Sequence, residues 1–71
     1  MQLSALRAVK GVTQWDLRIM TRINQSKISL IEHGYVIPSD KEKFLIAEAL
    51  GIEVDKIEWP TEKESPQRQD I

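Results

Sequence analysis

The sequence predicts an all-α domain made of five short helices. Apolar residues recur at helical spacing in successive segments of the chain, which is the pattern of helices with one buried face. Glycines at positions 11, 34 and 51 each follow such a segment, where a left-handed residue often closes a helix. The strand-like run at residues 35–37 is too short to count alone. The helices are expected at residues 2–10, 14–20, 25–33, 40–50 and 54–58.

The first two helices are indicated by apolar spacing and by a capping signal. Leu3, Leu6 and Val9 recur every three residues and predict the first helix. Thr13 opens the second helix, and Asp16 follows three residues later. This pair resembles a capping box, in which each side chain accepts the backbone N–H of the other residue, with Asp in place of the usual Glu.

Capping residues also mark the remaining helices. Asn24 is a good N-cap for the third helix, which Gly34 closes. Ser39 and Glu42 form a second capping box and open the fourth helix. Pro60 stops the short fifth helix, since proline cannot continue a hydrogen-bonded turn.

The chain has 71 residues, which is enough for one domain. We expect that domain over residues 1–60. Residues 61–71 form a polar tail with one apolar residue, so burial cannot repay the entropy of ordering it, and we expect it to be disordered. A domain of this size is marginally stable by itself, which favours help from a partner chain.

The composition excludes several classes of site. There are no cysteines, so disulfides and thiolate metal sites are excluded. One histidine cannot build a structural zinc site, which needs about four ligands. We therefore expect neither a metal nor another cofactor. No apolar run reaches the ~20 residues of a membrane span, and no signal peptide is recognisable, so we expect a cytoplasmic protein without membrane contact.

The charge is unevenly distributed although the net charge is only −1. Residues 1–34 hold five Lys or Arg against two Asp or Glu, a net +3, whereas residues 35–71 hold five against nine, a net −4. The basic half is where an anion such as phosphate would dock. The alternative is that these charges are ordinary solvated faces.

The second and third helices are expected to form a unit of their own. Only residues 21–23 connect them, so the two helices must cross steeply and pack their apolar side chains together. The apolar residues between them are Leu17, Ile23, Ile28 and Ile31. This arrangement exposes the N-terminal turn of the third helix, whose polar side chains can bind base edges or phosphate. These residues are Asn24, Gln25, Ser26 and Lys27.

An ordered set of residues runs through all these segments. Its most specific part is the run Ile28-Ser29-x-Ile31-Glu32-x-Gly34-x-x-x-Pro38. The other matching residues are Leu6, Arg7, Thr13, Gln14, Leu17, Ile23, Ser26, Ser39, Ala47, Leu50 and Gly51. Over residues 3–58 the chain resembles the phage-repressor, Cro-like (XRE-type) helix-turn-helix family. The resemblance implies a compact five-helix, lambda-repressor-like DNA-binding domain whose third helix enters the major groove.

The resemblance also implies roles for individual residues. At the start of the second helix, where free backbone N–H groups favour phosphate, the contacts fall on Thr13 and Gln14. The phosphate contacts at the ends of the recognition helix fall on Asn24, Lys27 and His33. The base-reading positions are Gln25, Ser26 and Leu30. The dimer contacts, near the end of the fourth helix and in the fifth, fall on Ile52, Val54, Ile57 and Trp59. The alternative for Trp59 is that it folds back to cap the core of its own chain, with Pro60 as a stop.

Some residues depart from the family pattern. Arg18 stands where alanine is usual and must extend outward along the seam between the helices. Arg22 stands at the usual turn glycine, where a left-handed conformation costs about 1 kcal/mol. Leu30 replaces a polar reader and can contact only a thymine methyl group. Arg18 and Arg22 are interpreted as structural rather than as base readers.

Two further side chains are assigned structural roles. Glu32 is expected to hold Arg7 in an internal ion pair, because no second acid, serine or histidine stands at a spacing that would make an acid–base pair. Phe44 is expected in the core, as the default for the single phenylalanine of a small protein.

The first functional hypothesis is a sequence-specific transcriptional regulator that binds double-stranded operator DNA as a homodimer. The alternative is a protein-interaction module that docks a partner protein, as an antitoxin docks a toxin, and the acidic second half of the chain favours it. A polyanion column separates the two, since a regulator should bind heparin or duplex DNA at low salt. An enzyme is the third hypothesis, and we do not expect it.

Overall fold

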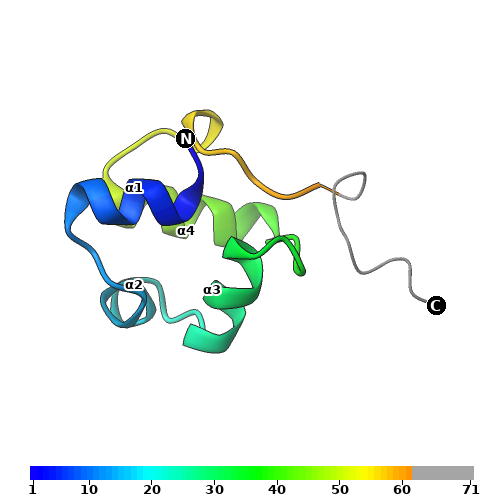
Figure 1. Cartoon of the computed structure of the whole chain (residues 1–71), viewed down its shortest axis with the longest axis horizontal. Coiled ribbons are helices and arrows are strands. Elements are labelled where there is room, and N and C mark those ends of the chain that lie inside the picture. Colours follow the sequence, from blue (N-terminus) through cyan, green and yellow to red (C-terminus); the bar gives the residue numbers. More distant parts are fainter. Residues whose placement is uncertain (62–71) are drawn as a thin grey trace.

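The computed structural model describes residues 1–61, and over these residues the chain is helical. In order, it contains α1 (Leu3–Lys10), α2 (Gln14–Thr21), α3 (Gln25–Glu32), α4 (Asp40–Leu50) and the 3₁₀ turn η1 (Val54–Lys56). The longest helix, α4, packs against α1, α2 and η1, while α2 also packs against α3 (Figure 1). Apart from Thr61, the predicted tail lies outside the described residues.

The expected fifth helix is shorter than residues 54–58 and is a 3₁₀ turn. Only the three residues of η1 are helical there, and Ile57 already has an extended backbone, with φ −101° and ψ 134°. The backbone N–H of Glu58 donates to the carbonyl oxygen of Met1 at 2.9 Å instead of to its own helix. Gln2 and Glu58 form an isolated parallel bridge, so the chain after η1 pairs with the segment before α1. Burial of Ile57 and this pairing together hold the segment extended.

The capping signals of the sequence are confirmed. The Thr13 hydroxyl accepts the N–H of Asp16 at 3.0 Å, and the Asp16 carboxylate accepts the N–H of Thr13 at 3.0 Å. Ser39 and Glu42 form the same reciprocal pair at 3.1 and 2.9 Å. Asn24 caps α3 by accepting the N–H of the second helical residue. These bonds satisfy backbone donors that have no partner within the helices.

Left-handed residues end α1, α2 and α4. Gly11 and Gly51 have φ values of 70° and 69°, which glycine adopts without a steric penalty. Arg22 also ends α2 in the left-handed conformation, with φ 65°, and it is the one non-glycine residue among those described with a positive φ. The turn after α2 therefore carries the backbone strain that the sequence indicated.

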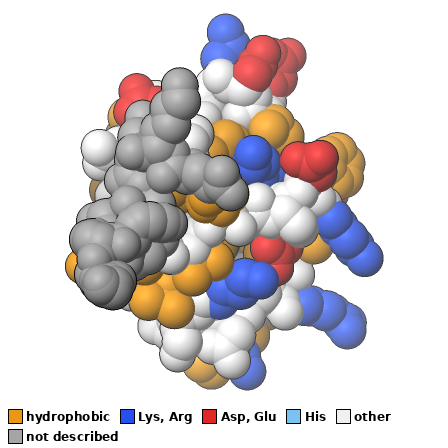
Figure 2. Space-filling model, turned by 90° about the vertical axis from the view of Figure 1, so that its right-hand side faces the viewer, with side chains coloured by type: hydrophobic (Ala, Val, Ile, Leu, Met, Phe, Trp, Pro, Cys, Tyr) orange, Lys and Arg blue, Asp and Glu red, His pale blue; other side chains and the backbone are white. Residues whose placement is uncertain are grey.

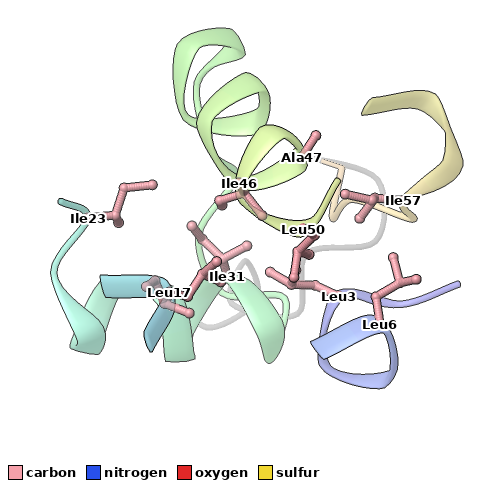
Figure 3. Packing of buried hydrophobic residues seen from close by; sticks show 10 residues of the cluster. Leu3, Leu6, Leu17, Ile23, Ile31, Ile46, Ala47, Leu50 and Ile57 are labelled. Atoms are coloured by element: carbon pink, nitrogen blue, oxygen red, sulfur yellow. The ribbon is translucent and has the colours of Figure 1, made fainter. Parts of the chain in front are cut away.

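The hydrophobic core lies where α2, α3 and α4 meet and extends between α1 and α4 (Figure 3). It consists of Leu3, Leu6, Leu17, Ile23, Ile28, Ile31, Ile46, Ala47, Leu50 and Ile57. All four apolar residues expected between α2 and α3 belong to it. Val9 does not, because a spacing of three residues drifts by about 60° around a helix at each step, which turns Val9 toward solvent.

The Phe44 expectation is also wrong. Phe44 is 57% exposed, although it lies beside core residues of α4. Ile46, Ala47 and Leu50 form the buried stripe of this helix, and Phe44 falls outside that stripe.

Among residues 1–61, no helix has the length and apolar character needed to cross a membrane.

Candidate nucleic-acid interface

The connection between α2 and α3 is fixed by a buried threonine. Thr21 donates its hydroxyl to the carbonyl oxygen of Leu17 at 2.7 Å and accepts the backbone N–H of Ile23 at 3.2 Å. Ile23 itself is buried in the core. The turn is therefore held from both sides, and this sets the position of α3 relative to α2. Thr21 was not predicted from the sequence, where its only signal is its place at the end of an amphipathic helix.

The N-terminal turn of α3 presents polar side chains to solvent. Asn24, Gln25 and Ser26 are all exposed. The Asn24 side chain is used, because its oxygen accepts the N–H of Ser26 at 2.8 Å. The Gln25 amide and the Ser26 hydroxyl have no hydrogen-bond partner among residues 1–61, so both are available to a ligand.

Lys27 is not a free cation. Its ammonium group donates to a carboxylate oxygen of Glu42 at 2.7 Å, which links α3 to the first turn of α4. The second carboxylate oxygen of Glu42 accepts the backbone N–H of Ser39. The hydrogen bond from Lys27, followed by that from Ser39, lowers the pKa of Glu42 below its ordinary value. The predicted phosphate contact is therefore occupied within the chain.

Gln14 belongs to a network that joins three helices. Its amide nitrogen donates to Glu32 Oε1 at 2.9 Å, and the guanidinium of Arg7 donates to both oxygens of the same carboxylate. The Glu32 side chain is 5% exposed. The hydrogen bond from Arg7 to Glu32 raises the pKa of the Arg7 guanidinium above its ordinary value. The expected ion pair between Arg7 and Glu32 is confirmed, and the amide oxygen and the second amide N–H of Gln14 remain for a further contact.

The end of α3 offers one apolar and one aromatic side chain. Leu30 is 42% exposed, so it can contact a ligand on the outer face of the helix. The Nδ1 atom of His33 lies 2.8 Å from the carbonyl oxygen of Ser29, which can only accept, so Nδ1 carries a proton. The His33 ring stacks on Tyr35 with 6.4 Å between centroids. Its Nε2 atom is left for an outside partner.

Two arginines that sequence analysis treated as structural lie exposed beside this turn. Arg18 and Arg22 line a shallow surface hollow together with Ile19, Ile23 and Asn24. The Arg18 guanidinium lies 4.7 Å from the ring centroid of Trp15, so it extends outward as expected and stacks on that ring. Asn24, the N-cap of α3, lines the same hollow, so Arg18 and Arg22 lie beside the start of α3.

The face that turns away from α1 carries mixed charge. Figure 2 shows lysine and arginine side chains interspersed with acidic and apolar ones, rather than merged into one basic surface. Among residues 1–61, no group of three or more His, Asp or Glu side chains could hold a metal ion. The arrangement thus offers hydrogen-bond donors and acceptors, exposed cations and one apolar contact.

The four expected dimer residues lie in different environments. Ile57 is buried in the core of its own chain. The Trp59 indole donates to the carbonyl oxygen of Val54 at 3.0 Å and packs against the same core. Ile52 and Val54 are half-buried and line a surface hollow. The other residues of that hollow are Phe44, Ala47, Glu48, Gly51 and Glu53.

No protein family, curated protein or solved structure matches this chain.

Proposed function

We propose that this protein is a transcriptional regulator that binds double-stranded DNA in a sequence-specific manner and inserts the N-terminal turn of α3 into the major groove. The observation that carries the proposal is the pair of unengaged polar side chains, Gln25 and Ser26, on a helix start that is exposed and rigidly held. A glutamine amide can bind adenine through two hydrogen bonds, and a serine hydroxyl suits several base edges. The resemblance to phage-repressor domains supports the same assignment.

The surroundings of this turn supply contacts to the DNA backbone. Arg18 and Arg22 are exposed next to it and carry charge that phosphates attract. The backbone N–H groups of Gln14 and Trp15, at the start of α2, have no partner within the helix and favour an anion. Leu30 lies one turn further along α3 and suits a thymine methyl group.

Selection of bound sites from random duplex DNA, followed by two variants, tests this proposal. Gln25→Ala should cost about 1–3 kcal/mol on the selected site and little on random duplex. Arg22→Gly removes a cation while retaining the left-handed turn, so it should weaken binding to both duplexes equally and flatten the salt slope by about one unit. Absence of duplex binding at low salt, or equal losses for Gln25→Ala on both duplexes, would refute the proposal.

We propose further that the regulator acts as a homodimer. One α3 turn offers few contacts, so a single half-site binds weakly, and linking two half-sites raises avidity without new base contacts. The hollow lined by Phe44, Ile52 and Val54 is the apolar surface that a second copy would cover. Sedimentation at several concentrations, for the wild type and Phe44→Ser, checks this. A wild type that stays monomeric both with and without DNA contradicts it.

A second candidate function is favoured by the charge around the same hollow. Glu48 and Glu53 are exposed at its edge, so a two-fold pairing of this surface would bring like charges together. These acids would instead suit an apolar and basic segment of a partner protein. A chain that passes through a heparin column at low salt and remains monomeric would favour this partner-binding function over DNA binding.

A further inference from the structure

The acceptor that holds Lys27 is itself fixed in place. Glu42 binds Lys27 through one carboxylate oxygen, at 2.7 Å, and the N–H of Ser39 through the other, at 2.9 Å. Its backbone N–H in turn donates to the Ser39 hydroxyl at 3.1 Å. Because the carboxylate belongs to the capping box of α4, it cannot turn away from Lys27 without breaking a cap. The ammonium group, not the carboxylate, is the mobile member of this pair.

The pair lies at the edge of the candidate interface. Lys27 is the third residue of α3 and follows directly after Gln25 and Ser26. The Lys27 side chain is 42% exposed, and that of Glu42 is 20% exposed. Solvent, and therefore a phosphate group, can reach the ammonium end of the pair. Any phosphate that binds Lys27 must compete with a carboxylate that is already in contact with it.

We propose that Glu42 withholds Lys27 from the DNA backbone and thereby lowers the affinity of this protein for duplex DNA of any sequence. The inference rests on the proposed function and adds a residue that sets the balance between backbone and base contacts. Phosphate contacts supply most of the binding that does not depend on sequence, whereas base contacts supply discrimination. Because Glu42 neutralises Lys27 in this way, the base contacts of Gln25 and Ser26 contribute a larger share of the total free energy of binding.

The size of the effect follows from counterion release. Each phosphate contact steepens the dependence of log affinity on log salt by about 0.9. One additional contact therefore raises affinity by about threefold to tenfold near 0.1 M salt. The change should be the same for a selected site and for random duplex, because a lysine–phosphate contact carries no sequence information.

The decisive variant is Glu42→Gln, since glutamine keeps an oxygen for the Ser39 N–H and so retains the capping box. Asp55→Asn is the matched control, because it removes the same charge from an exposed residue of η1. Lys27→Gln is made alone and together with Glu42→Gln. Affinities for random and selected duplexes are measured over a range of salt concentrations, and thermal unfolding confirms that every variant is folded.

Glu42→Gln should raise affinity for both duplexes by about threefold to tenfold and steepen the salt slope by about 0.9, whereas Asp55→Asn should change neither by as much as twofold. Lys27→Gln alone should have little effect, because its cation is already engaged. The gain from Glu42→Gln should vanish when Lys27 is also replaced. An unchanged gain in that background would mean simple repulsion of phosphate by the carboxylate and would overturn the inference. Equal behaviour of Glu42→Gln and Asp55→Asn would overturn it as well. If no variant binds duplex, the proposed function itself fails.

Discussion

Replacing Arg7 by methionine should destabilise the fold by about 3 kcal/mol, because it leaves the Glu32 carboxylate buried without its counter-charge. The guanidinium donates twice to Glu32 and once to the carbonyl oxygen of Val12, at 3.0 Å. Methionine keeps most of the apolar stem of the side chain, so the loss reports on the charged contacts rather than on packing.

The magnitude follows from the geometry of the network. Removing one partner of a buried pair costs about 3–5 kcal/mol. Arg7 is 17% exposed, and Glu32 keeps one hydrogen bond from Gln14, so the lower end of that range applies. A chain of this length has a total stability of roughly 4–10 kcal/mol, so the loss is a large fraction of it. The melting temperature should fall by more than 10 °C, at about 4–8 °C for each kcal/mol.

Urea and thermal unfolding followed by far-ultraviolet circular dichroism measure this change. Lys10→Met is the control, since it removes a cation from an exposed position of the same helix and should stay within about 0.5 kcal/mol of the wild type. The double variant Arg7→Met/Glu32→Gln should recover part of the loss, because no buried charge then lacks a partner. A loss below about 1 kcal/mol for Arg7→Met, or no recovery in the double variant, would refute the reasoning.

Three further outcomes concern helix ends and acid. Arg22→Gly should stabilise the fold by about 0.5–1 kcal/mol, because glycine relieves the left-handed strain of about 1–2 kcal/mol at some cost in chain entropy, and the melting temperature checks this. Ser39→Ala should cost about 1 kcal/mol in urea unfolding, since a backbone donor of α4 loses its cap. The Glu42 carboxyl has a pKa below the ordinary 4.5 in the folded protein, so its ionised form stabilises the fold above that pH, and this contribution is lost as pH falls through the lower folded value. Unfolding curves of the wild type and Glu42→Gln should therefore converge in acid, and a constant difference between them would contradict the assignment.

Local signals predicted the helices well because they depend on neighbours in sequence. The two capping boxes and the left-handed Arg22 need only residues within a few positions of each other. The predicted length of the fifth helix was wrong for the opposite reason. Ile57 is buried in the core, and the backbone N–H of Glu58 donates to Met1, which lies far away in sequence, so neither residue continues the helix. No local pattern contains that information.

The candidate site shows the same division. The exposure of Gln25 and Ser26 follows from the short connection between α2 and α3, which the spacing indicated. The engagement of Lys27 by Glu42 joins residues 15 positions apart and depends on where the first turn of α4 lies relative to α3. Gln14 is similar, since the carboxylate that binds its amide comes from the far end of α3. Residue type therefore predicted which groups could bind a ligand, but tertiary contacts decide which of them are free.

The pairing of residues 1–2 with residue 58 brings the beginning and the end of the helical part of the chain together. Figure 1 shows the N-terminal end beside the segment after η1. The order of the helices along the chain then depends only on where the chain has its two ends. The packing of the helices does not depend on it. A chain joined from residue 60 to residue 1 through a short linker, and opened between α3 and α4 near the exposed Tyr35, would bring every helix to the same neighbours. In such a circular permutant, α4 would be the first helix and α3 the last. The contact between α3 and α4 would then connect the two ends of the new chain.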